Sequence, residues 1–571
     1  MTPRLSRRSL LRHAVASAAG LATSRLAIAA TGTTAGVLAS ASAAGAAGGA
    51  KAFSRALPIP KVLRDDDITL VARQADVSIL PGAPTRMWTF NGTFPGPTIR
   101  RPSGRRTRVT IRHELPVEAQ TLTIHHHGAH SASKHDGQPE SYVIQPQESR
   151  TYVYEHMEDG EPERAALQWY HDHSHHHASR NSWMGLAGFF ILDDEVEAEL
   201  PLPRGRYELP LFITDRQFDK DNQLDMALFD SPAANREVSG EIYLVNGAPQ
   251  PHAEVEPRRY RLRLHNGSGF RILNLSLIIE GAFTPAAQMT QIGTESGLLP
   301  APVDRTTILL GPAERADVVV DFSEFAGRQI TLASLARANA LGSDAAPEVG
   351  LVQFRVARTA ARRGPGAPPK KLRPLPDWVA DASQQPDRVW SFGTGYDVET
   401  RYEAHTVNGR AFDHGRVDGQ VELDSVETWM LLNTTTRTHY IHIHDVDWVV
   451  LSRNGASPEP YEAGLKETFL LDPGEYVLVA AKFTDHLGRF MIHCHMLDHE
   501  DGGMMATWEV VEPGAGTATT LTAAERRRVD TVLAAMRANP GAPAPPALLE
   551  GLPLSRVRSD GPGSPYTCTL P

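Results

Sequence analysis

The sequence predicts an all-β protein built from several domains, and three observations support this fold class. Apolar residues recur in short runs that alternate with polar residues or are rich in β-branched ones, and Gly, Pro, Asn or Asp often flank these runs. Three segments, 90–99, 244–255 and 406–417, each carry an Asn-Gly pair near their start, which indicates a repeated unit. Many short strands with turns are typical of sandwiches and barrels. The predicted strands lie within 106–115, 148–157, 185–194, 259–268, 314–323, 426–435 and 474–483.

The length of 571 residues fits three β domains of similar size, which we expect at 51–200, 201–365 and 366–515. A linker rich in Pro, Gly and basic residues should separate the second domain from the third at 356–378. In the remaining segment, 516–571, Thr522 and Glu525 form a capping box at the start of one surface helix, and a Pro/Ala-rich tail follows it.

Residues 1–50 resemble a twin-arginine export signal. The segment contains the paired Arg7 and Arg8, a weakly apolar region rich in Ala, Gly, Ser and Thr, and small-residue sites between Ala41 and Ala47. Arg25 interrupts the apolar region, which makes it a poor membrane span. We therefore expect an exported protein, periplasmic or secreted, with no membrane attachment once the signal is removed.

The charge balance argues against nucleic acid as a partner. Residues 1–50 hold five of the 57 basic residues and none of the 67 acidic ones, so the remaining chain has 52 basic residues and a net charge near −15. An acidic surface repels phosphate backbones and anionic membranes, and the sequence shows no basic cluster with interleaved aromatic residues. A small molecule is the more plausible partner.

Cysteine usage points to a special role for one residue. Exported proteins often contain disulfides, yet this chain has only Cys494 and Cys568. Cys568 lies near the end of the tail and is expected to be a loose thiol. Cys494 instead stands between two histidines, with another histidine and two methionines just downstream.

Ten of the 24 histidines fall into four short motifs with H-x-H or similar spacing. On a strand, residues i and i+2 face the same side about 6.6 Å apart, so each H-x-H pair aims two imidazoles at one place. Two pairs in the first domain and two in the third would supply eight nitrogens to a shared metal site. Imidazole suits copper, zinc, iron or nickel. The motif residues are His125 and His127; His171 and His173; His439, His442 and His444; and His493, His495 and His499.

Cys494 indicates which metal is expected. It points away from His493 and His495 on a strand and should therefore serve a second metal, together with His439, His499 and Met504. Two histidines, one thiolate and a weak axial methionine are the ligands of blue-copper electron-transfer sites, whereas zinc would favour more thiolates or a carboxylate. The HCH sequence thus links two metal sites through a few covalent bonds.

The four motifs resemble, in order and spacing, those of the three-domain multicopper oxidases, over roughly residues 90–511. The resemblance implies three cupredoxin-like domains and four copper ions: one type 1, one type 2 and a type 3 pair. It implies type 1 ligands His439, Cys494, His499 and Met504; type 2 ligands His125 and His442; and type 3 ligands His127, His171, His173, His444, His493 and His495.

The segments 460–468 (PYEAGLKET) and 499–505 (HEDGGMM) are most similar to the bacterial branch of spore-coat laccases, bilirubin oxidases and phenoxazinone synthases. Tyr440 departs from this pattern, because relatives usually carry proline between the first and second histidine of the third motif. Asp136 and Glu500 stand at positions that resemble the family's proton-relay acids, and both are also compatible with turn or loop roles.

The resemblance implies a laccase-like oxidase that removes single electrons from phenols, aminophenols or bilirubin-like donors at the type 1 copper. Four electrons would reduce dioxygen to water at a trinuclear cluster between the first and third domains. An axial Met504 should give a moderate potential, which favours electron-rich donors.

Three alternatives remain open at this stage. A cuprous oxidase for copper tolerance often carries a methionine-rich segment, whereas the 12 methionines here are dispersed. A non-catalytic copper-binding relative would not need the complete ligand set, and a copper nitrite reductase would lack His495.

Six further histidines are expected to be solvated or to lie around the ligands, with adventitious metal binding as the alternative: His126, His130, His135, His175, His176 and His177.

Overall fold

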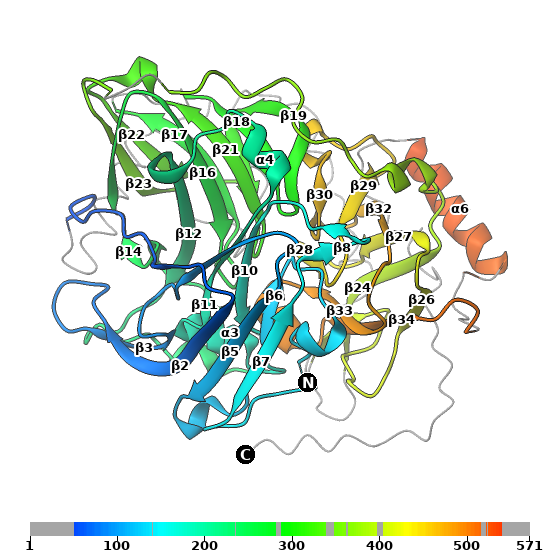
Figure 1. Ribbon diagram of the computed structural model, residues 1–571. Coiled ribbons are helices and arrows are strands. Elements are labelled where there is room, and N and C mark those ends of the chain that lie inside the picture. The colour runs from blue at the N-terminus through cyan, green and yellow to red at the C-terminus, as the bar shows by residue number, and fades with distance from the viewer. Residues whose placement is uncertain are drawn as a thin grey trace, which may run out of the picture.

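The computed structural model describes residues 51–139, 141–233, 236–280, 287–337, 348–360, 364–396, 403–515, 521 and 523–538. The predicted export signal, Cys568 and the Pro/Ala-rich tail lie outside these residues. Figure 1 shows three bodies of β-structure, with the first and second on the left and the third on the right. Of the helices in the described part of the chain, none has the length and apolar character needed to cross a membrane.

The first domain consists of two sheets around one core that includes Leu70, Phe90 and Ile111. In β5, every second side chain from Thr107 to His113 faces inward, as the alternation in the sequence predicts. One sheet has the order β1 (Val62–Leu63), β4 (Thr98–Pro102), β11 (Ala187–Asp193), β10 (Leu167–Asp172), β6 (Ile124–His127). The other has the order β3 (Thr85–Phe90), β2 (Asp67–Val77), β5 (Thr107–Glu114), β7 (Ser149–Tyr154). In addition, β8 (Met157–Glu158) pairs with β9 (Glu161–Pro162).

The second domain has the same plan with more strands, and its core includes Leu262, Leu275 and Val318. One sheet has the order β14 (Ala248–Pro249), β13 (Ile242–Val245), β12 (Glu208–Arg216), β16 (Arg259–Asn266), β21 (Arg315–Asp321), β18 (Met289–Thr294), β19 (Gly297–Arg305). The other has β15 (His252–Val255), β23 (Val349–Val356), β22 (Gln329–Ser334), β17 (Leu273–Ile279), β20 (Thr307–Leu310).

The third domain encloses a core rich in tryptophan, in which the Trp429 and Trp448 ring centroids are 4.6 Å apart. One sheet has the order β25 (Glu403–Val407), β24 (Arg388–Tyr396), β27 (Val426–Asn433), β32 (Tyr476–Lys482), β29 (Trp448–Arg453), β30 (Leu465–Lys466). The other has β26 (Gly419–Glu422), β34 (Met505–Val511), β33 (Gly488–Cys494), β28 (His439–Ile443), β31 (Thr468–Leu471).

The Asn-Gly pairs mark the same feature in all three domains. Asn91-Gly92, Asn246-Gly247 and Asn408-Gly409 all have positive φ angles, as two-residue hairpin turns require. Each asparagine side chain also accepts a hydrogen bond from a main-chain N–H of a neighbouring strand. The donors and distances are Val71 (2.7 Å), Phe212 (2.8 Å) and Ser391 (2.9 Å). The repeated interaction supports the prediction of three similar units, whose exact boundaries stay a prediction.

Helices are few and short in the described part of the chain. They are α3 (Ala178–Met184), α4 (Glu195–Glu199), α5 (Leu497–Asp501) and α6 (Ala523–Arg537), with 3₁₀ turns η1 (Val117–Ala119), η2 (Ser133–His135), η3 (Gly205–Tyr207), η4 (Ala227–Phe229), η6 (Ser323–Phe325), η8 (Asp377–Asp381) and η9 (Pro460–Glu462). The predicted C-terminal helix is confirmed as α6, whose Val529 is buried against the third domain beside Met430 and Tyr476. The all-β prediction is likewise confirmed, and all seven predicted runs contain a strand.

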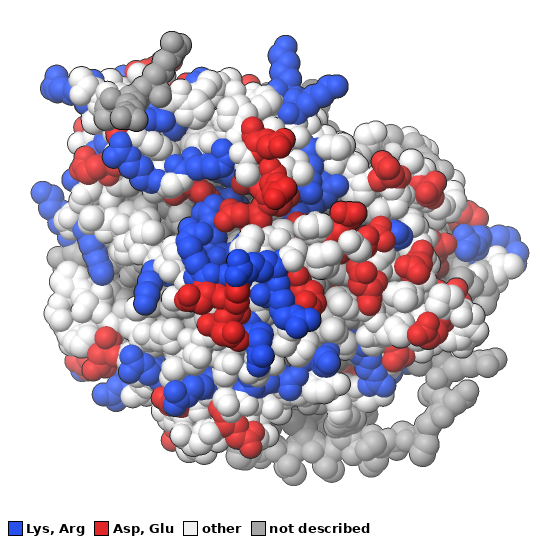
Figure 2. All heavy atoms as spheres, in the orientation of Figure 1, with Lys and Arg blue, Asp and Glu red and all other residues white. Residues whose placement is uncertain are grey.

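Exposed ion pairs contribute little to the stability of this fold. On the face shown in Figure 2, positive and negative residues lie interspersed. Exposed pairs such as Arg106–Glu155, at 2.8 Å, contribute about 0–1 kcal/mol each. The stability of the domains therefore rests mainly on the three apolar cores.

Tyr440, the departure from the family pattern, lies at a contact between domains. Its side chain is fully buried in the third domain and faces Gly311 of the second. A Cβ atom at Gly311 would overlap the Tyr440 ring. The bulky tyrosine is accommodated because its neighbour has no side chain.

His130 connects the first domain to the third. Its Nε2 lies 3.0 Å from Asp485 Oδ2, and its Nδ1 lies 3.5 Å from Asp445 Oδ1. Burial disfavours the charged imidazole, but Asp445 and the Asp485 hydrogen bond outweigh burial and raise the pKa of His130 to about 10. The other groups around this ring are His486, whose ring is tilted against it with centroids 4.8 Å apart, and the acids Glu158 and Glu163.

We predict that the folded chain loses stability as the pH rises above neutral, because His130 loses its proton. Its unfolded pKa is about 6.5, so its contribution is fully present below that pH and is lost as the pH rises through about 10. His130→Gln should therefore flatten the loss of unfolding free energy between pH 7 and 10, by an amount on the order of a few kcal/mol. Denaturant unfolding at several pH values measures this difference.

His486→Gln is the matched control, because burial lowers the pKa of His486 to about 4 and its ring is neutral throughout this window. Equal pH profiles for His130→Gln and the unaltered chain would contradict the assignment.

Candidate metal centres

The two faces of one sheet in the third domain separate two groups of ligand-type side chains. In β28 and β33, His442 pairs in register with His493, and Ile441 with Cys494. Because neighbouring residues on a strand point to opposite faces, His442 and His493 project from one face and Cys494 from the other. This alternation produces two separate centres.

The Cys494 centre lies inside the third domain. Cys494 Sγ is 3.5 Å from His439 Nδ1 and 3.6 Å from His499 Nδ1, and these two nitrogens are 3.2 Å apart. Met504 is fully buried in the same apolar core, and its N–H and C=O bond to His499 and Cys494 respectively. His439, Cys494 and His499 are each at most 1% exposed. The centre thus joins a thiol and two imidazole nitrogens in a buried, apolar surrounding.

The histidine cluster lies between the first and third domains. In the first domain, His125 of β6 pairs in register with His171 of β10, and His127 lies two residues further along β6. Across the interface, His125 Nε2 is 3.3 Å from His442 Nε2. His493 Nε2 is 3.2 Å from both His173 Nε2 and His444 Nε2. Residues separated by more than 300 positions in the sequence therefore share one site.

All eight cluster histidines expected from the sequence meet at this interface, each at most 1% exposed. His495 completes the set, with its ring centroid 4.9 Å from that of His127 and 5.3 Å from that of His171. Three overlapping triads have nitrogen atoms within 4.8 Å of one another: His125, His442 and His444; His125, His127 and His171; and His173, His444 and His493.

The hydrogen bonds around the cluster leave unprotonated ring nitrogens on its inner side. The Nδ1–H groups of His125, His171 and His442 donate to main-chain oxygens of Asp136, Asp172 and Glu467, at 2.6, 2.9 and 2.9 Å. The Nε2 atoms opposite these donors carry lone pairs, and His125 Nε2 and His442 Nε2 face each other. His171 Nε2 has no hydrogen-bond partner among the described residues. A cation between such nitrogens satisfies them, so the donor set fits metal ions.

Burial favours the metal-binding protonation states of the imidazoles. It is the main cause that lowers the pKa of His173 to about 4 and that of His439 to about 3. The same cause lowers the pKa well below 6.5 for His127, His171, His442, His444, His495 and His499. These rings are therefore neutral, and neutral imidazole is the form that binds metals.

Burial has the opposite consequence for the thiol. It raises the pKa of Cys494 to about 12, so the sulfur keeps its proton until a metal cation replaces that proton. A soft thiolate with two imidazoles and a methionine suits copper, as the sequence indicates.

The two predicted acids flank the cluster. Asp136 Oδ2 lies 2.8 Å from His444 Nδ1, and Asp136 Oδ1 lies 3.4 Å from His125 Nδ1. Glu500 of α5 lies 3.1 Å from His493 Nδ1 and 3.5 Å from His173 Nδ1. Burial raises the pKa of Glu500, but His173 and His493 outweigh burial and lower it to about 2. Both carboxylates thus touch the outer nitrogens of cluster histidines.

Gly137 allows Asp136 to reach this position. It has a φ of +87°, and a Cβ there would lie 2.6 Å from the His125 Cα atom. The Asp-Gly turn can therefore pack closely against β6, which places the Asp136 carboxylate within reach of His125 and His444.

Sequence reasoning missed several residues at these centres. His405 packs against His499 in a tilted arrangement with ring centroids 4.2 Å apart, and Thr435 Oγ1 lies 2.8 Å from His439 Nε2. Glu467 Oε1 lies 3.1 Å from His127 Nε2, and Arg315 of the second domain pairs with Glu467. Glu467 stands in the PYEAGLKET segment, but its contact with His127 joins residues 340 positions apart, which no local pattern indicates.

The spare histidines differ from one another, and two of them are buried close to the ligand-bearing segments, which is one of the two expected placements. His126 is buried against Phe190 and Tyr154 of the first core, because it alternates with the ligands His125 and His127 on β6. His130 is buried in its contact with Asp445 and Asp485. His176 is exposed, and the remaining three are half-buried: His135, His175 and His177.

Comparisons with known proteins agree with these centres. Residues 71–197 and 382–514 match family models described as multicopper oxidase. The chain is 32% identical over 528 residues to a laccase of Bacillus subtilis (strain 168), covering 81% of this chain and 99% of that protein. It is 33% identical over 435 residues to a bilirubin oxidase of Albifimbria verrucaria, covering 73% and 72% respectively. The structure resembles a crystal structure of a multi-copper oxidase from Pediococcus acidilactici, with a TM-score of 0.68, 31% identity and coverage of 82% and 95%.

Proposed function

This chain belongs to the multicopper oxidase family, and we propose that its two buried centres hold four copper ions. The chain is a laccase-like copper oxidoreductase that uses dioxygen as electron acceptor. The observation that carries the assignment of the coppers is the triangle of Cys494 Sγ and the Nδ1 atoms of His439 and His499, with sides of 3.5, 3.6 and 3.2 Å.

The ligands divide between the two centres by strand face. His439, Cys494, His499 and Met504 would hold the type 1 copper. His125 and His442, whose Nε2 atoms are 3.3 Å apart, would hold the type 2 copper. Six histidines would hold the type 3 pair: His127, His171, His173, His444, His493 and His495. Bound copper supplies one-electron redox chemistry at the first centre and the site of dioxygen reduction at the cluster.

Cys494 has a further role because of its covalent neighbours. The main chain joins it directly to His493 and His495, which face the cluster on the other side of the sheet. Only a few covalent bonds therefore separate the two centres, and this short connection supports electron transfer between them.

Asp136 and Glu500 would hold and deliver the protons that water formation consumes. Reducing dioxygen to two waters takes four electrons and four protons, and both carboxylates touch cluster histidines. A cavity of about 340 Å³ at the surface between the first and third domains includes Gln138 in its wall. Gln138 Nε2 donates to Asp136 Oδ2 at 3.2 Å, which links the cavity to the carboxylate.

The electron donors proposed are small, electron-rich aromatic molecules: phenols, aminophenols or bilirubin-like tetrapyrroles. His439 and His499 are at most 1% exposed, so a donor would pass its electron from outside without binding the metal. The resemblance to a laccase and a bilirubin oxidase supports this class.

Oxygen uptake by the copper-loaded protein tests the function. We predict rapid uptake with a methoxyphenol, an o-aminophenol or bilirubin, and loss of uptake in Cys494→Ser, which lacks the thiolate of the first centre. Uptake with Cu(I) alone would identify a cuprous oxidase. No uptake with any donor, despite full copper loading, would leave a copper-binding protein without oxidase activity.

Neutralising the acids should slow dioxygen reduction without affecting electron entry. We predict that Asp136→Asn and Glu500→Gln each lower steady-state oxygen consumption by roughly 10²–10⁴-fold, because proton transfer is impaired while the amide oxygens can still accept hydrogen bonds. Anaerobic bleaching of the blue absorption by a donor should keep its rate. Asp418→Asn, a buried acid that contacts Arg416 and Thr507, is the control. An equal fall in oxygen consumption in Asp418→Asn would contradict the proton-relay role of Asp136 and Glu500.

We further propose that residues 1–50 direct export by the twin-arginine pathway, based on Arg7, Arg8 and the weakly apolar region that follows. Replacing Arg7 and Arg8 by lysine should keep the protein in the cytoplasm, because the pathway depends on the arginine pair. Cell fractionation measures the distribution, and Arg4→Lys with Arg12→Lys serves as the control. An unchanged exported fraction in the Arg7/Arg8 variant would contradict the proposal.

A further inference from the structure

The two imidazoles of the Cys494 centre are covered by different groups. His439 and His499 are each at most 1% exposed, so an electron from an outside donor must cross at least one further side chain to reach either ring. Electrons cross covalent bonds and hydrogen bonds more readily than gaps between unbonded atoms. The contacts of each ring therefore decide which of the two takes up the electron.

The outer edge of His499 is closed. Its Nε2 atom is buried and has no hydrogen-bond partner among the described residues. His405 packs against the ring with centroids 4.2 Å apart, and Phe270 of the second domain lies edge-on at 5.8 Å. These two covering side chains are themselves buried, at 5% and 2% exposure. A donor on this side would therefore face a complete unbonded layer.

The outer edge of His439 is connected to the surface. Thr435 Oγ1 lies 2.8 Å from His439 Nε2, and the same hydroxyl lies 2.8 Å from Asn433 Oδ1. Because an amide oxygen can only accept, the hydroxyl donates to Asn433 and accepts from the imidazole N–H. Thr435 is partly exposed, and Thr434 and Thr436 on either side of it are exposed. One hydrogen bond and one side chain thus join this imidazole to the surface.

Asn433 holds the turn that carries Thr435. Its side chain is fully buried, and its Nδ2 donates to the main-chain oxygens of Arg437 at 2.7 Å and Leu471 at 3.0 Å. The main-chain N–H of Arg437 in turn donates to Thr435 Oγ1 at 3.1 Å. The hydroxyl is therefore fixed beside His439 before any donor arrives.

The charges around this turn are paired. Arg437, whose side chain is 58% exposed, pairs with Glu237 of the second domain, and Arg337 pairs with Asp472. A protein surface steers ions by its summed field, which is small where opposite charges lie together. The turn therefore suits a neutral aromatic donor better than an ionic one.

We propose that the electron donor docks on the exposed turn 434–436, and that its electron enters the Cys494 centre through the Thr435 hydroxyl and His439, and not through His499. The proposal rests on the proposed function and identifies the donor as a neutral phenol or aminophenol. Each phenol gives one electron to the centre and its hydroxyl proton to the solvent, which breaks the O–H bond and leaves a phenoxyl radical.

Anaerobic bleaching of the blue absorption by a methoxyphenol, followed in the copper-loaded whole protein, tests this entry route. Thr435→Val removes the hydroxyl but keeps a side chain of similar shape, and we expect it to lose most of the bleaching rate. Redox titration of the variant measures its potential, and the loss of rate should exceed what any change in potential explains. Thr436→Trp should raise the KM for the methoxyphenol and leave the potential unchanged, because the indole would occupy the docking surface.

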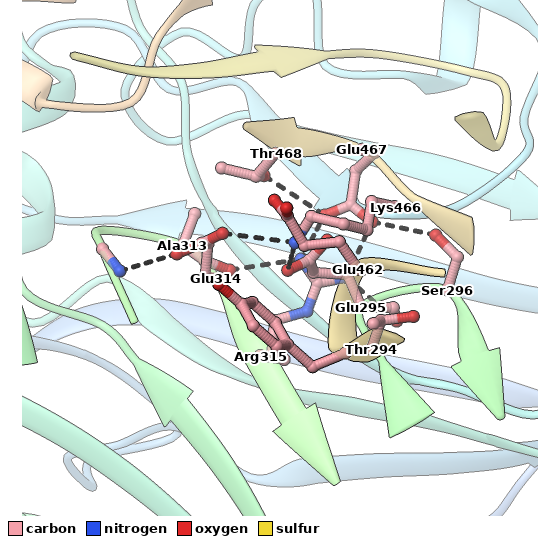
Figure 3. A network of polar contacts seen from close by, with 12 residues as sticks. Thr294, Glu295, Ser296, Ala313, Glu314, Arg315, Glu462, Lys466, Glu467 and Thr468 are labelled. Carbon is pink, nitrogen blue, oxygen red and sulfur yellow. Dashed lines mark hydrogen bonds and ion pairs between the residues drawn. The ribbon is translucent and has the colours of Figure 1, made fainter. Parts of the chain in front are cut away.

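Two other Thr→Val variants are matched controls. The hydrogen bonds of the Thr438 hydroxyl, with Asp472 at 2.9 Å and Arg337 at 3.4 Å, involve no proposed ligand. The Thr294 hydroxyl donates at 2.6 Å to the main-chain oxygen of Leu465, within the network of the second and third domains in Figure 3. Thr438→Val and Thr294→Val should lower thermal stability and leave the bleaching rate unchanged.

Three results would overturn the proposal. Thr435→Val could bleach as fast as the unaltered protein, or both controls could slow bleaching as much as Thr435→Val does. An unchanged KM in Thr436→Trp would show that the donor does not dock on this turn.

These readouts separate the entry route from the proposed function, because bleaching is measured without dioxygen. An unaltered protein that bleaches but takes up no oxygen would contradict the oxidase function alone, since the variants still report on where the electron enters. A protein that binds no copper at the Cys494 centre would overturn both.

Discussion

The structure depends on one unfavourable arrangement: buried imidazole lone pairs that face each other without a proton between them. His125, His171 and His442 each donate their outer N–H to a main-chain oxygen, so their inner nitrogens have no proton to share. Such nitrogens, buried without partners, destabilise the folded chain until a cation joins them. The fold of the first and third domains can tolerate this cost because large apolar cores support each domain separately.

Strand geometry then divides the chemistry. His439 and Cys494 lie on the face of β28 and β33 that points into the third core, and His442, His444, His493 and His495 lie toward the first domain. The same alternation that packs a sheet thus separates an electron-collecting site from a dioxygen-reducing site, and leaves them connected by the peptide bonds of a single HCH segment. The second domain also contacts this region, because its Arg315 pairs with Glu467 of the third domain.

Much of this was predictable from the sequence because the relevant patterns are local. The all-β fold with three cupredoxin-like domains and the family follow from short alternating runs and four histidine motifs, and both predictions are confirmed. The contacts of Glu467 with His127, and of His130 with Asp485, were not predictable, because each joins residues more than 300 positions apart across a domain interface. The space that accommodates Tyr440 was likewise not predictable, because Gly311 of the second domain provides it.

The most direct test of this account is a crystal structure of the copper-loaded protein with anomalous scattering measured at the copper edge. We predict one copper peak between His439, Cys494 and His499, and three among the eight buried histidines between the first and third domains. Copper peaks elsewhere in the chain, with none among the buried histidines, would contradict the central claim that these buried lone pairs form the metal centres.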